Sequence, residues 1–437
     1  CRGPTTSRDL ANALGLTPSR VEEALRRLEL EGFVMRCRSE SAVSPPRYVA
    51  RRLLARIHAY TVQRLRREIE PVSQRDFMRF LLEWQHVTPA ARLRGPQAVL
   101  RVIDQLQGFE AAAGAWEPEL LRARIADYDP KWLDELCWSG ELVWGRLAPA
   151  RPARDEAQQR SQVTRSSLIT LLRRADLDWL LAAARGSTAA REPVTHETAR
   201  ILDELSRRGA LFSSELAHAS GYSRRDVEDA LWEGVALGRL TCDGFHAVRA
   251  LVGASQEPHT AVPRLPIGFR KPGSSLPRGD GRWALLPDPT PSMDPDELAE
   301  AVAGQLLHRW GVLTIELIRQ ETTSLSIRDL ISALRRLEAR GLVRGGRFVS
   351  GFSGEQYALT EALETLRSVR KQALAEVEVR LSACDPLNLV GVVVPGARVP
   401  RLRGNWVLYR DGLPIDDRTG FAENGDAAHA TRREYEL

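Results

Sequence analysis

Residues 7–35 contain two short runs whose apolar positions are spaced three and four apart, as on one face of an amphipathic helix. The first run ends at Gly15. The second run begins where Thr17 is placed as an N-cap and Pro18 at the first helical position. It ends at Gly32, where a left-handed C-cap costs glycine little, and a β-prone segment follows. The pattern predicts a helix, a tight turn, a capped helix and a β-hairpin, which is the layout of a winged helix-turn-helix.

The same pattern returns further along the chain. Copies lie at 213–240 and 315–343, and a weaker copy lies at 129–143, with Asp129 placed as the cap and Pro130 at the first helical position. A repeated unit of this kind determines the architecture. The sequence therefore predicts a mainly α fold with small β-hairpins. It forms a tandem array of winged-helix modules, four of them clear and a fifth less clear, followed by a β-rich C-terminal module.

Proline-rich stretches and changes of pattern divide the chain further. The predicted domains are winged helix 1 with a connecting helix at 1–70, an enlarged winged helix 2 at 71–190, winged helix 3 at 191–251, a proline-rich linker at 252–295, winged helix 4 at 296–360, and a helix with the β-rich module at 361–437.

Local signals also predict individual elements within these domains. A turn at 242–245 is expected to form the wing of the third module, and Gly345-Gly346 the wing turn of the fourth. One strand-like island at 282–286 suggests that the linker lies against a domain. A helix is expected over 361–381, and the β-branched run at 387–394 favours a strand.

Composition narrows the class of protein. The chain has 437 residues, which suits several domains, and it has no run of about 18 apolar residues, so no membrane span is expected. Five scattered cysteines lack ligand spacing, which argues against a metal site or a disulfide framework and fits a cytoplasmic location. The sequence opens with Cys1 and shows no signal peptide, and we expect it to be a piece of a longer polypeptide.

Arginine supplies nearly all of the positive charge, since only three of the 62 basic residues are lysines, and the formal net charge is +5. Arginine suits bidentate contacts to phosphate, although a GC-rich genome would produce the same bias. Outward positions on the predicted second helices and wings are the DNA-binding candidates: Arg20, Arg224, Arg225, Arg328, Arg335, Arg336, Arg344 and Arg347. Acidic residues share the helices of the first and third copies, so the fourth copy is the better candidate.

Three long motifs resemble one family. The segments RDFMRFLLEWQHV (75–87), 106–147 and DPLNLVGVVVPGARVPRLRGNWVLYRDGLPI (385–415) look like the carboxy-terminal region of the bacterial Lhr (large helicase-related) DNA-repair helicases. The resemblance implies an upstream 3′–5′ motor that uses ATP and Mg²⁺. It also implies single-stranded or damaged DNA as a partner and self-association to a tetramer. The chain itself has no GxxxxGK[ST] loop, so no ATP binding and no cofactor are expected within it.

A second resemblance concerns chemistry. Gln105-Leu106-Gln107, followed by Trp116 and by residues 140–143 and 176–179, is similar to AlkZ-type winged-helix DNA glycosylases. The resemblance implies excision of uracil or a damaged base, with Gln105 and Gln107 orienting water or stabilising charge at the sugar carbon. Polar residues at a helix end more often cap it or face solvent.

A glycosylase also needs a carboxylate near the sugar carbon. The sequence leaves four carboxylate candidates that it cannot rank, namely Asp104, Glu110, Asp385 and Asp411. His86 could act as a general base, but a structural role is the stronger interpretation of this histidine. A winged-helix transcription regulator is the third function considered.

Overall fold

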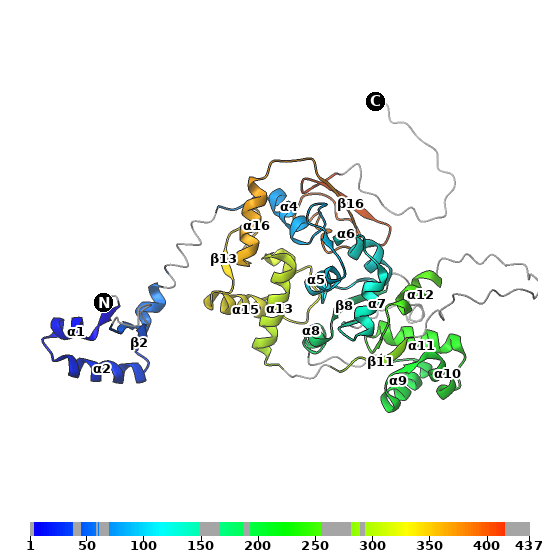
Figure 1. Cartoon of the computed structure of the whole chain (residues 1–437), viewed down its shortest axis with the longest axis horizontal. Helices are drawn as coiled ribbons and strands as arrows, with labels where there is room; N and C mark the ends of the chain where they lie inside the picture. Colours follow the sequence, from blue (N-terminus) through cyan, green and yellow to red (C-terminus); the bar gives the residue numbers. More distant parts are fainter. Residues whose placement is uncertain are drawn as a thin grey trace, which may run out of the picture. The chain divides into compact units, whose positions relative to one another are not determined.

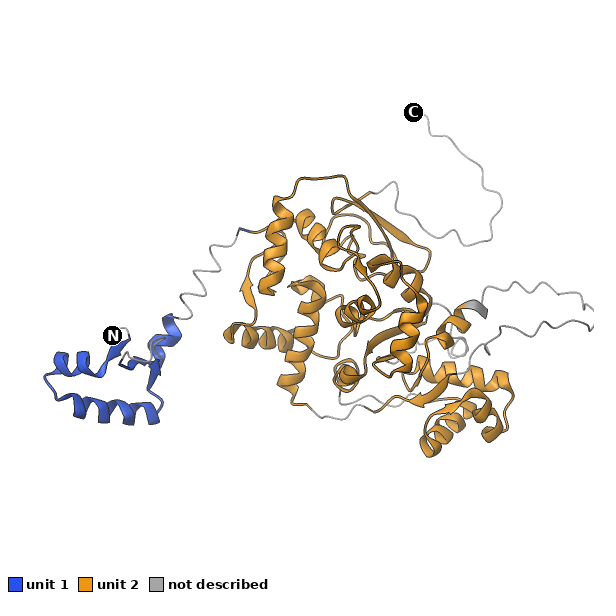
Figure 2. Cartoon of the chain, in the orientation of Figure 1, with its two compact units in different colours: residues 1–70 blue, residues 71–437 orange. Residues whose placement is uncertain are grey.

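A computed structural model describes residues 4–37, 45–57, 60, 70–148, 167–186, 193–254, 281–288 and 293–415. The chain divides into two compact units, Cys1–Glu70 and Pro71–Leu437, each described by itself below (Figure 2).

The first unit is a small winged helix. Strand β1 (Thr5–Thr6) leads into helices α1 (Ser7–Leu14) and α2 (Pro18–Leu30), and strands β2 (Val34–Cys37) and β3 (Arg47–Ala50) follow. Thr17 is the N-cap residue of α2, as predicted, and Gly15 ends α1 at a φ of 66°. Ala11, Val21, Leu25 and Tyr48 form the core. Of the connecting helix predicted at 51–70, residues 51–57 are helical, and most of the remainder lies outside the described residues.

The second winged helix occupies the middle of the second unit. It contains α5 (Gln97–Leu106), β5 (Ala111–Ala112), the 3-10 turn η1 (Ala113–Ala115), the π-helix η2 (Trp116–Leu121), α6 (Arg122–Arg124), α7 (Pro130–Trp138), β7 (Leu142–Gly145), β8 (Leu168–Arg173) and α8 (Leu177–Arg185). Asp129 caps α7 through its side chain and Pro130 is the first helical residue, as predicted. A short parallel pair, β4 (Leu93–Arg94) with β6 (Ile125–Ala126), lies beside it.

The third winged helix contains α9 (His196–Arg208), β9 (Leu211–Phe212), α10 (Ser213–Ser220), α11 (Arg224–Ala236) and β10 (Leu240–Cys242). The hairpin predicted at 242–245 was wrong. Residues His246–Ala254 form helix α12, and β10 pairs instead with β11 (Arg282–Leu285). Arg249 holds α12 in place, because its guanidinium bonds Glu117 at 2.6 Å and Asp134 at 2.8 Å. The strand-like island predicted at 282–286 thus supplies the middle strand of the third sheet. Most of the predicted linker at 252–295 lies outside the described residues.

The fourth winged helix contains α13 (Pro295–Trp310), β12 (Val312–Leu313), α14 (Ile315–Ile318), α15 (Ile327–Ala339), β13 (Arg344–Gly346) and β14 (Gln356–Ala358). Gly345 and Gly346 lie within β13 and pair with Tyr357 and Gln356, so the prediction that they form the wing turn was wrong. The connection between the paired strands is residues 347–355.

The C-terminal part differs most from expectation. Helix α16 (Thr360–Lys371) packs on α4 (Gln74–Trp84) and ends ten residues before the predicted end at 381. Strands β15 (Glu378–Ser382), β16 (Trp406–Arg410) and β17 (Leu413–Pro414) form an antiparallel sheet. Residues 387–394 are largely buried, with Gly391 exposed, and they form turns and one isolated bridge between Val390 and Val394 but no strand of this sheet. Their backbone groups bond one another, as in Val393 N donating to Leu389 O at 2.9 Å.

Strand order confirms the predicted winged-helix repeat. The sheets of the four winged helices have the orders β1-β3-β2, β5-β8-β7, β9-β11-β10 and β12-β14-β13. The last strand of each winged helix therefore lies in the middle of its sheet. The fold is mainly helical, with small antiparallel sheets, as predicted (Figure 1). The finer domain boundaries stay predictions.

Aromatic packing joins the second and third modules into one body. The ring centroid of Trp144 on β7 lies 6.0 Å from that of Trp232 and 6.2 Å from that of Trp283. Thr241 Oγ1 donates to Trp144 O at 2.6 Å across the same contact. All three tryptophans are buried, so the modules share one core.

Candidate functional site

A polar network surrounds Gln107 where α5 ends. The helix stops at Leu106, and Gly108 at a φ of 87° turns the chain away, which leaves the Gln107 side chain pointing into the boundary with α13. Its Nε2 donates to Asp176 Oδ2 at 2.9 Å and to Gln305 Oε1 at 3.1 Å. Its Oε1 accepts from the backbone N of Arg173 at 3.2 Å. The Gln107 amide is therefore held by a side-chain carboxylate, a side-chain amide and a backbone N–H.

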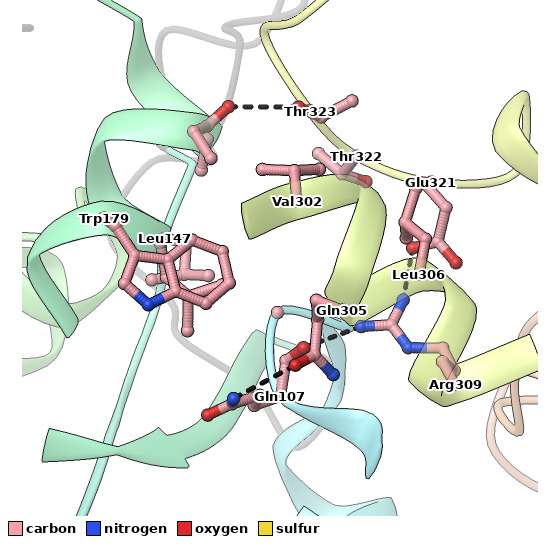
Figure 3. Close-up of a pocket in the computed structure, with 14 residues that line it drawn as sticks. Gln107, Leu147, Trp179, Val302, Gln305, Leu306, Arg309, Glu321, Thr322 and Thr323 are labelled. Atoms are coloured by element: carbon pink, nitrogen blue, oxygen red, sulfur yellow. Dashed lines mark hydrogen bonds and ion pairs between the residues drawn. The ribbon is translucent and has the colours of Figure 1, made fainter. Parts of the chain in front are cut away.

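This network borders a small pocket (Figure 3). Trp179 and Leu180 of α8 line one side, and Val302 and Leu306 of α13 line the other. The pocket measures about 40 Å³, room for roughly one to three water molecules. A nucleobase does not fit unless α8 and α13 separate.

A buried ion pair closes another side of the pocket. Arg309, only 1% exposed, forms an ion pair with Glu321, and its NH2 donates to Gln107 O at 2.7 Å. Glu321 also accepts from Trp310 Nε1 at 2.6 Å. These residues and Asp176 are the site residues that sequence reasoning missed. The only signal in the sequence was Asp176 within the second resemblance, whereas nothing local marks Arg309 or Glu321.

Gln105 does not share this pocket. Its Nε2 donates to Trp84 O at 2.9 Å, and its buried Oε1 has no hydrogen-bond partner in the described part of the chain. The helix ends between the two glutamines, but their side chains still have different surroundings. Of the pair, the structure places only Gln107 at the pocket.

Two candidate carboxylates have structural partners. Asp385 is fully buried and bonds both terminal nitrogens of buried Arg124, at 2.6 and 2.9 Å. Asp411 accepts from the backbone N of Glu376 at 3.1 Å and of Val377 at 3.2 Å. Neither carboxylate lines the Gln107 pocket, although Asp411 lines a separate pocket, and the catalytic role of both stays a prediction.

The other candidates are also committed to contacts within the fold. Asp104 Oδ2 accepts from Arg173 NH2 at 2.9 Å. Glu110 Oε1 accepts from the backbone N of Leu147 at 2.8 Å, and burial raises the pKa of this carboxyl above its usual range. His86 lies with Nδ1 at 3.2 Å from Ala91 O, and burial lowers its pKa.

The DNA-binding candidates divide into two groups. Arg335 pairs with Glu355 at 3.0 Å, and Arg336 pairs with Glu300 at 2.7 Å and with Asp296 at 3.2 Å, so both guanidinium groups are engaged by carboxylates of the fourth module. Arg225 lies 4.0 Å from Asp229 and is largely exposed. The remaining candidates have exposed side chains: Arg20, Arg224, Arg328, Arg344 and Arg347. Arg335 and Arg336 would thus have to give up carboxylate partners to contact phosphate, and the DNA-binding role of all eight arginines stays a prediction.

Neither a membrane-spanning helix nor a metal-binding cluster occurs in the described ranges. None of their helices combines the length and apolar character that a bilayer crossing requires. Within the same ranges, no three histidine, cysteine or acidic side chains are grouped as a metal ion would need.

The repeated sheets and capped helix pairs define a tandem winged-helix protein. Residues 2–35 match the family model for winged helix-turn-helix DNA-binding domains. Residues 72–165 and 292–378 match two models described as the winged-helix domain of large helicase-related protein.

Two curated relatives align over most of the chain. The Lhr helicase/probable uracil glycosylase of Mycolicibacterium smegmatis is 28% identical over 463 aligned residues, covering 98% of this chain and 29% of that protein. The Lhr helicase/uracil glycosylase of Escherichia coli is 28% identical over 424, covering 89% and 26%. The chain is homologous to the carboxy-terminal part of the Lhr helicase/uracil glycosylases. It spans less than a third of either relative.

Among solved structures, the Streptomyces sahachiroi DNA glycosylase AlkZ aligns with a TM-score of 0.45 and 17% identity, over 79% of this chain and 87% of that one.

Proposed function

We propose that this chain is the DNA-binding region of a DNA-repair helicase of the Lhr type, acting on single-stranded or damaged DNA. The homology and the winged-helix match support this proposal. The observation that carries it is the wing of the fourth module, where Arg344 and Arg347 are exposed while neighbouring Arg335 and Arg336 are paired with carboxylates. A winged helix uses such a wing to follow the DNA backbone.

Salt dependence tests this contact. Replacing Arg344 and Arg347 with alanine removes two phosphate contacts, so the plot of log affinity against log salt should flatten by about 1.8 units for duplex DNA and by about 1.4 units for single-stranded DNA. The control is the Arg207→Ala, Arg208→Ala double variant, which removes the same charge from the end of α9, outside the wing of the fourth module. An unchanged slope in the wing variant, or an equal change in both variants, would contradict the wing contact.

The proposal extends to what the parent protein supplies. ATP and Mg²⁺ serve a motor outside this chain, and the chain uses no cofactor of its own. Purified chain should therefore show no DNA-dependent ATP turnover.

Self-association to a tetramer is the remaining part of the proposal, and it rests on the family resemblance alone. Light scattering that reports a monomer at micromolar concentration would contradict it.

Uracil excision is the second candidate function, because both relatives carry uracil glycosylase in their names and because Gln107 is bonded to the Asp176 carboxylate beside a pocket. Breaking a glycosidic bond develops positive charge on the sugar, which a carboxylate and an oriented amide stabilise. Since the pocket is too small for a base, excision requires α8 and α13 to move apart. The base must also leave its stack, so single-stranded uracil DNA should be the better substrate.

Separate variants of the two glutamines test this second function. Gln107→Ala should abolish uracil release from single-stranded DNA, because it removes the amide that orients Asp176, whereas Gln105→Ala should retain release. Asp176→Asn should lower release as strongly as Gln107→Ala. DNA affinity, measured in parallel, should be unchanged in all three. Full excision by Gln107→Ala would exclude the pocket from the chemistry.

A further inference from the structure

A second, wider cavity is a groove that shares no lining residue with the Gln107 pocket. It separates the C-terminal sheet from the segment that contains η2 and α6, and in Figure 1 β16 and α6 lie near each other. Its volume is about 400 Å³, within the range of ligand-binding sites. The lining residues used below are Glu119, Arg122, Arg380, Ser382 and Trp406.

Strand register explains why three of these side chains face the groove together. Arg380 pairs with Leu408 and Ser382 pairs with Trp406, so Arg380, Ser382 and Trp406 project from the same face of the β15–β16 pair. The guanidinium carbon of Arg380 lies 4.4 Å from the centroid of the Trp406 ring, within the range of a cation–π contact. The sheet therefore presents a guanidinium lying over an indole ring, which is called the Arg380–Trp406 stack below.

The charge of the groove is positive. Glu119 is its carboxylate, and it is engaged by Arg403 Nε at 3.3 Å and by the Ser382 hydroxyl. Arg122 and Arg380 are exposed, and no carboxylate among the described residues pairs with either one. Two guanidinium groups that pair with no carboxylate of the described residues thus line the groove that contains the Trp406 ring.

We propose that this groove binds single-stranded DNA, with phosphates on Arg122 and Arg380 and a base packed against the Arg380–Trp406 stack. Proteins that hold single strands combine a positive groove with aromatic or guanidinium planes on which bases stack. A duplex keeps its bases stacked on one another, so it cannot use the ring. The groove is a site separate from the winged-helix contact, and it rests on the proposed function only in that the ligand is DNA.

Binding of a labelled 12-nucleotide oligo(dT) and of a duplex of equal length tests the site by fluorescence anisotropy. Trp406→Ala should weaken single-strand binding about tenfold and leave duplex binding unchanged. Trp406→Phe keeps an aromatic face and should stay within about threefold of the natural protein. Arg122→Gln with Arg380→Gln should weaken single-strand binding and flatten its salt slope by about 1.4 units, as two lost contacts to a single strand require. Arg410→Gln, on the same sheet but paired with Glu378, is the matched control.

The outcomes separate this inference from the proposed function. Single-strand binding by a folded Trp406→Ala variant that equals the natural protein's overturns the groove, and so does an equal loss on single strand and duplex. If only the Arg344, Arg347 variant loses affinity, the result contradicts the groove as a DNA site and supports the wing contact. If only the groove variants lose single-strand affinity, the result supports the groove and contradicts the wing contact. Competition by thymidine monophosphate as strong as by the oligonucleotide would overturn the assignment of a strand as ligand.

Discussion

Glu110 is a carboxylate enclosed by the second winged helix. Burial is the largest influence on its pKa and raises it, while Arg146 and the backbone N–H groups of Leu147 and Ala148 oppose that rise. A raised pKa in the folded state means that the native protein binds this proton more tightly than the unfolded chain. The stability contributed by Glu110 is therefore fully present below its unfolded pKa and is lost as pH rises through its folded pKa.

Replacing Glu110 with glutamine should consequently stabilise the protein more at high pH than at low pH. Glutamine keeps an oxygen that accepts from Leu147 N but carries no charge to desolvate. Urea unfolding midpoints of both proteins, measured at pH 5 and pH 8, should differ more at pH 8. Glu135→Gln, at an exposed position on α7, serves as the control. A midpoint difference that is the same at both pH values would refute the argument.

Residue types were easier to predict than their partners. The sequence pointed to Gln107 and Asp385 as polar residues worth attention. However, Gln107 bonds a residue 198 positions away and Asp385 one 261 positions away. Local pattern carries no information on such contacts, because only the packed fold brings the segments together. A buried ion pair and a catalytic carboxylate therefore look the same in the sequence.

At the scale of single elements, β11 is the strand on which the third module depends. It lies between β9 and β10, and Trp283 on it is 4% exposed, with its ring centroid 5.5 Å from that of Trp232. Trp283→Ala should lower the free energy of unfolding by about 3–5 kcal/mol, because it empties a core shared by two modules. Arg282→Ala, one position away and exposed, should lose less than about 1 kcal/mol. Equal losses in urea unfolding of the two variants would contradict this.

Elements whose signals are local were predicted well. The capped second helices begin at Pro18 and Pro130 as expected, because N-cap and proline preferences act within one turn. Two of the errors concern pairing between distant segments. The strand-like island at 282–286 was predicted, but no local signal showed that β10 would pair with it beyond α12, or that residues 378–382 would leave a helical pattern to pair with β16. In each case a strand partner far along the chain decides the conformation.

At the scale of the second unit, buried contacts fasten the modules to one another. Asp385 bonds Arg124, Arg124 NH2 donates to Gln85 Oε1 at 2.9 Å, and Gln85 Nε2 donates to Arg309 O at 3.1 Å. This series connects the C-terminal part, α6, α4 and α13. The Gln107 pocket lies at the boundary between the second and fourth modules, so any widening of it has to work against these contacts.

The position of β11 also sets an order of events on the ribosome. Residues 243–281 separate the end of β10 from the start of β11, and these 39 residues must be synthesised before the middle strand of the third sheet exists. At roughly 5–20 residues per second, the gap lasts about 2–8 s. During that interval Trp144 and Trp232 lack Trp283 as a neighbour. The nascent chain therefore exposes the apolar surface around Trp144 and Trp232 for seconds, and a chaperone that binds apolar segments could bind it there.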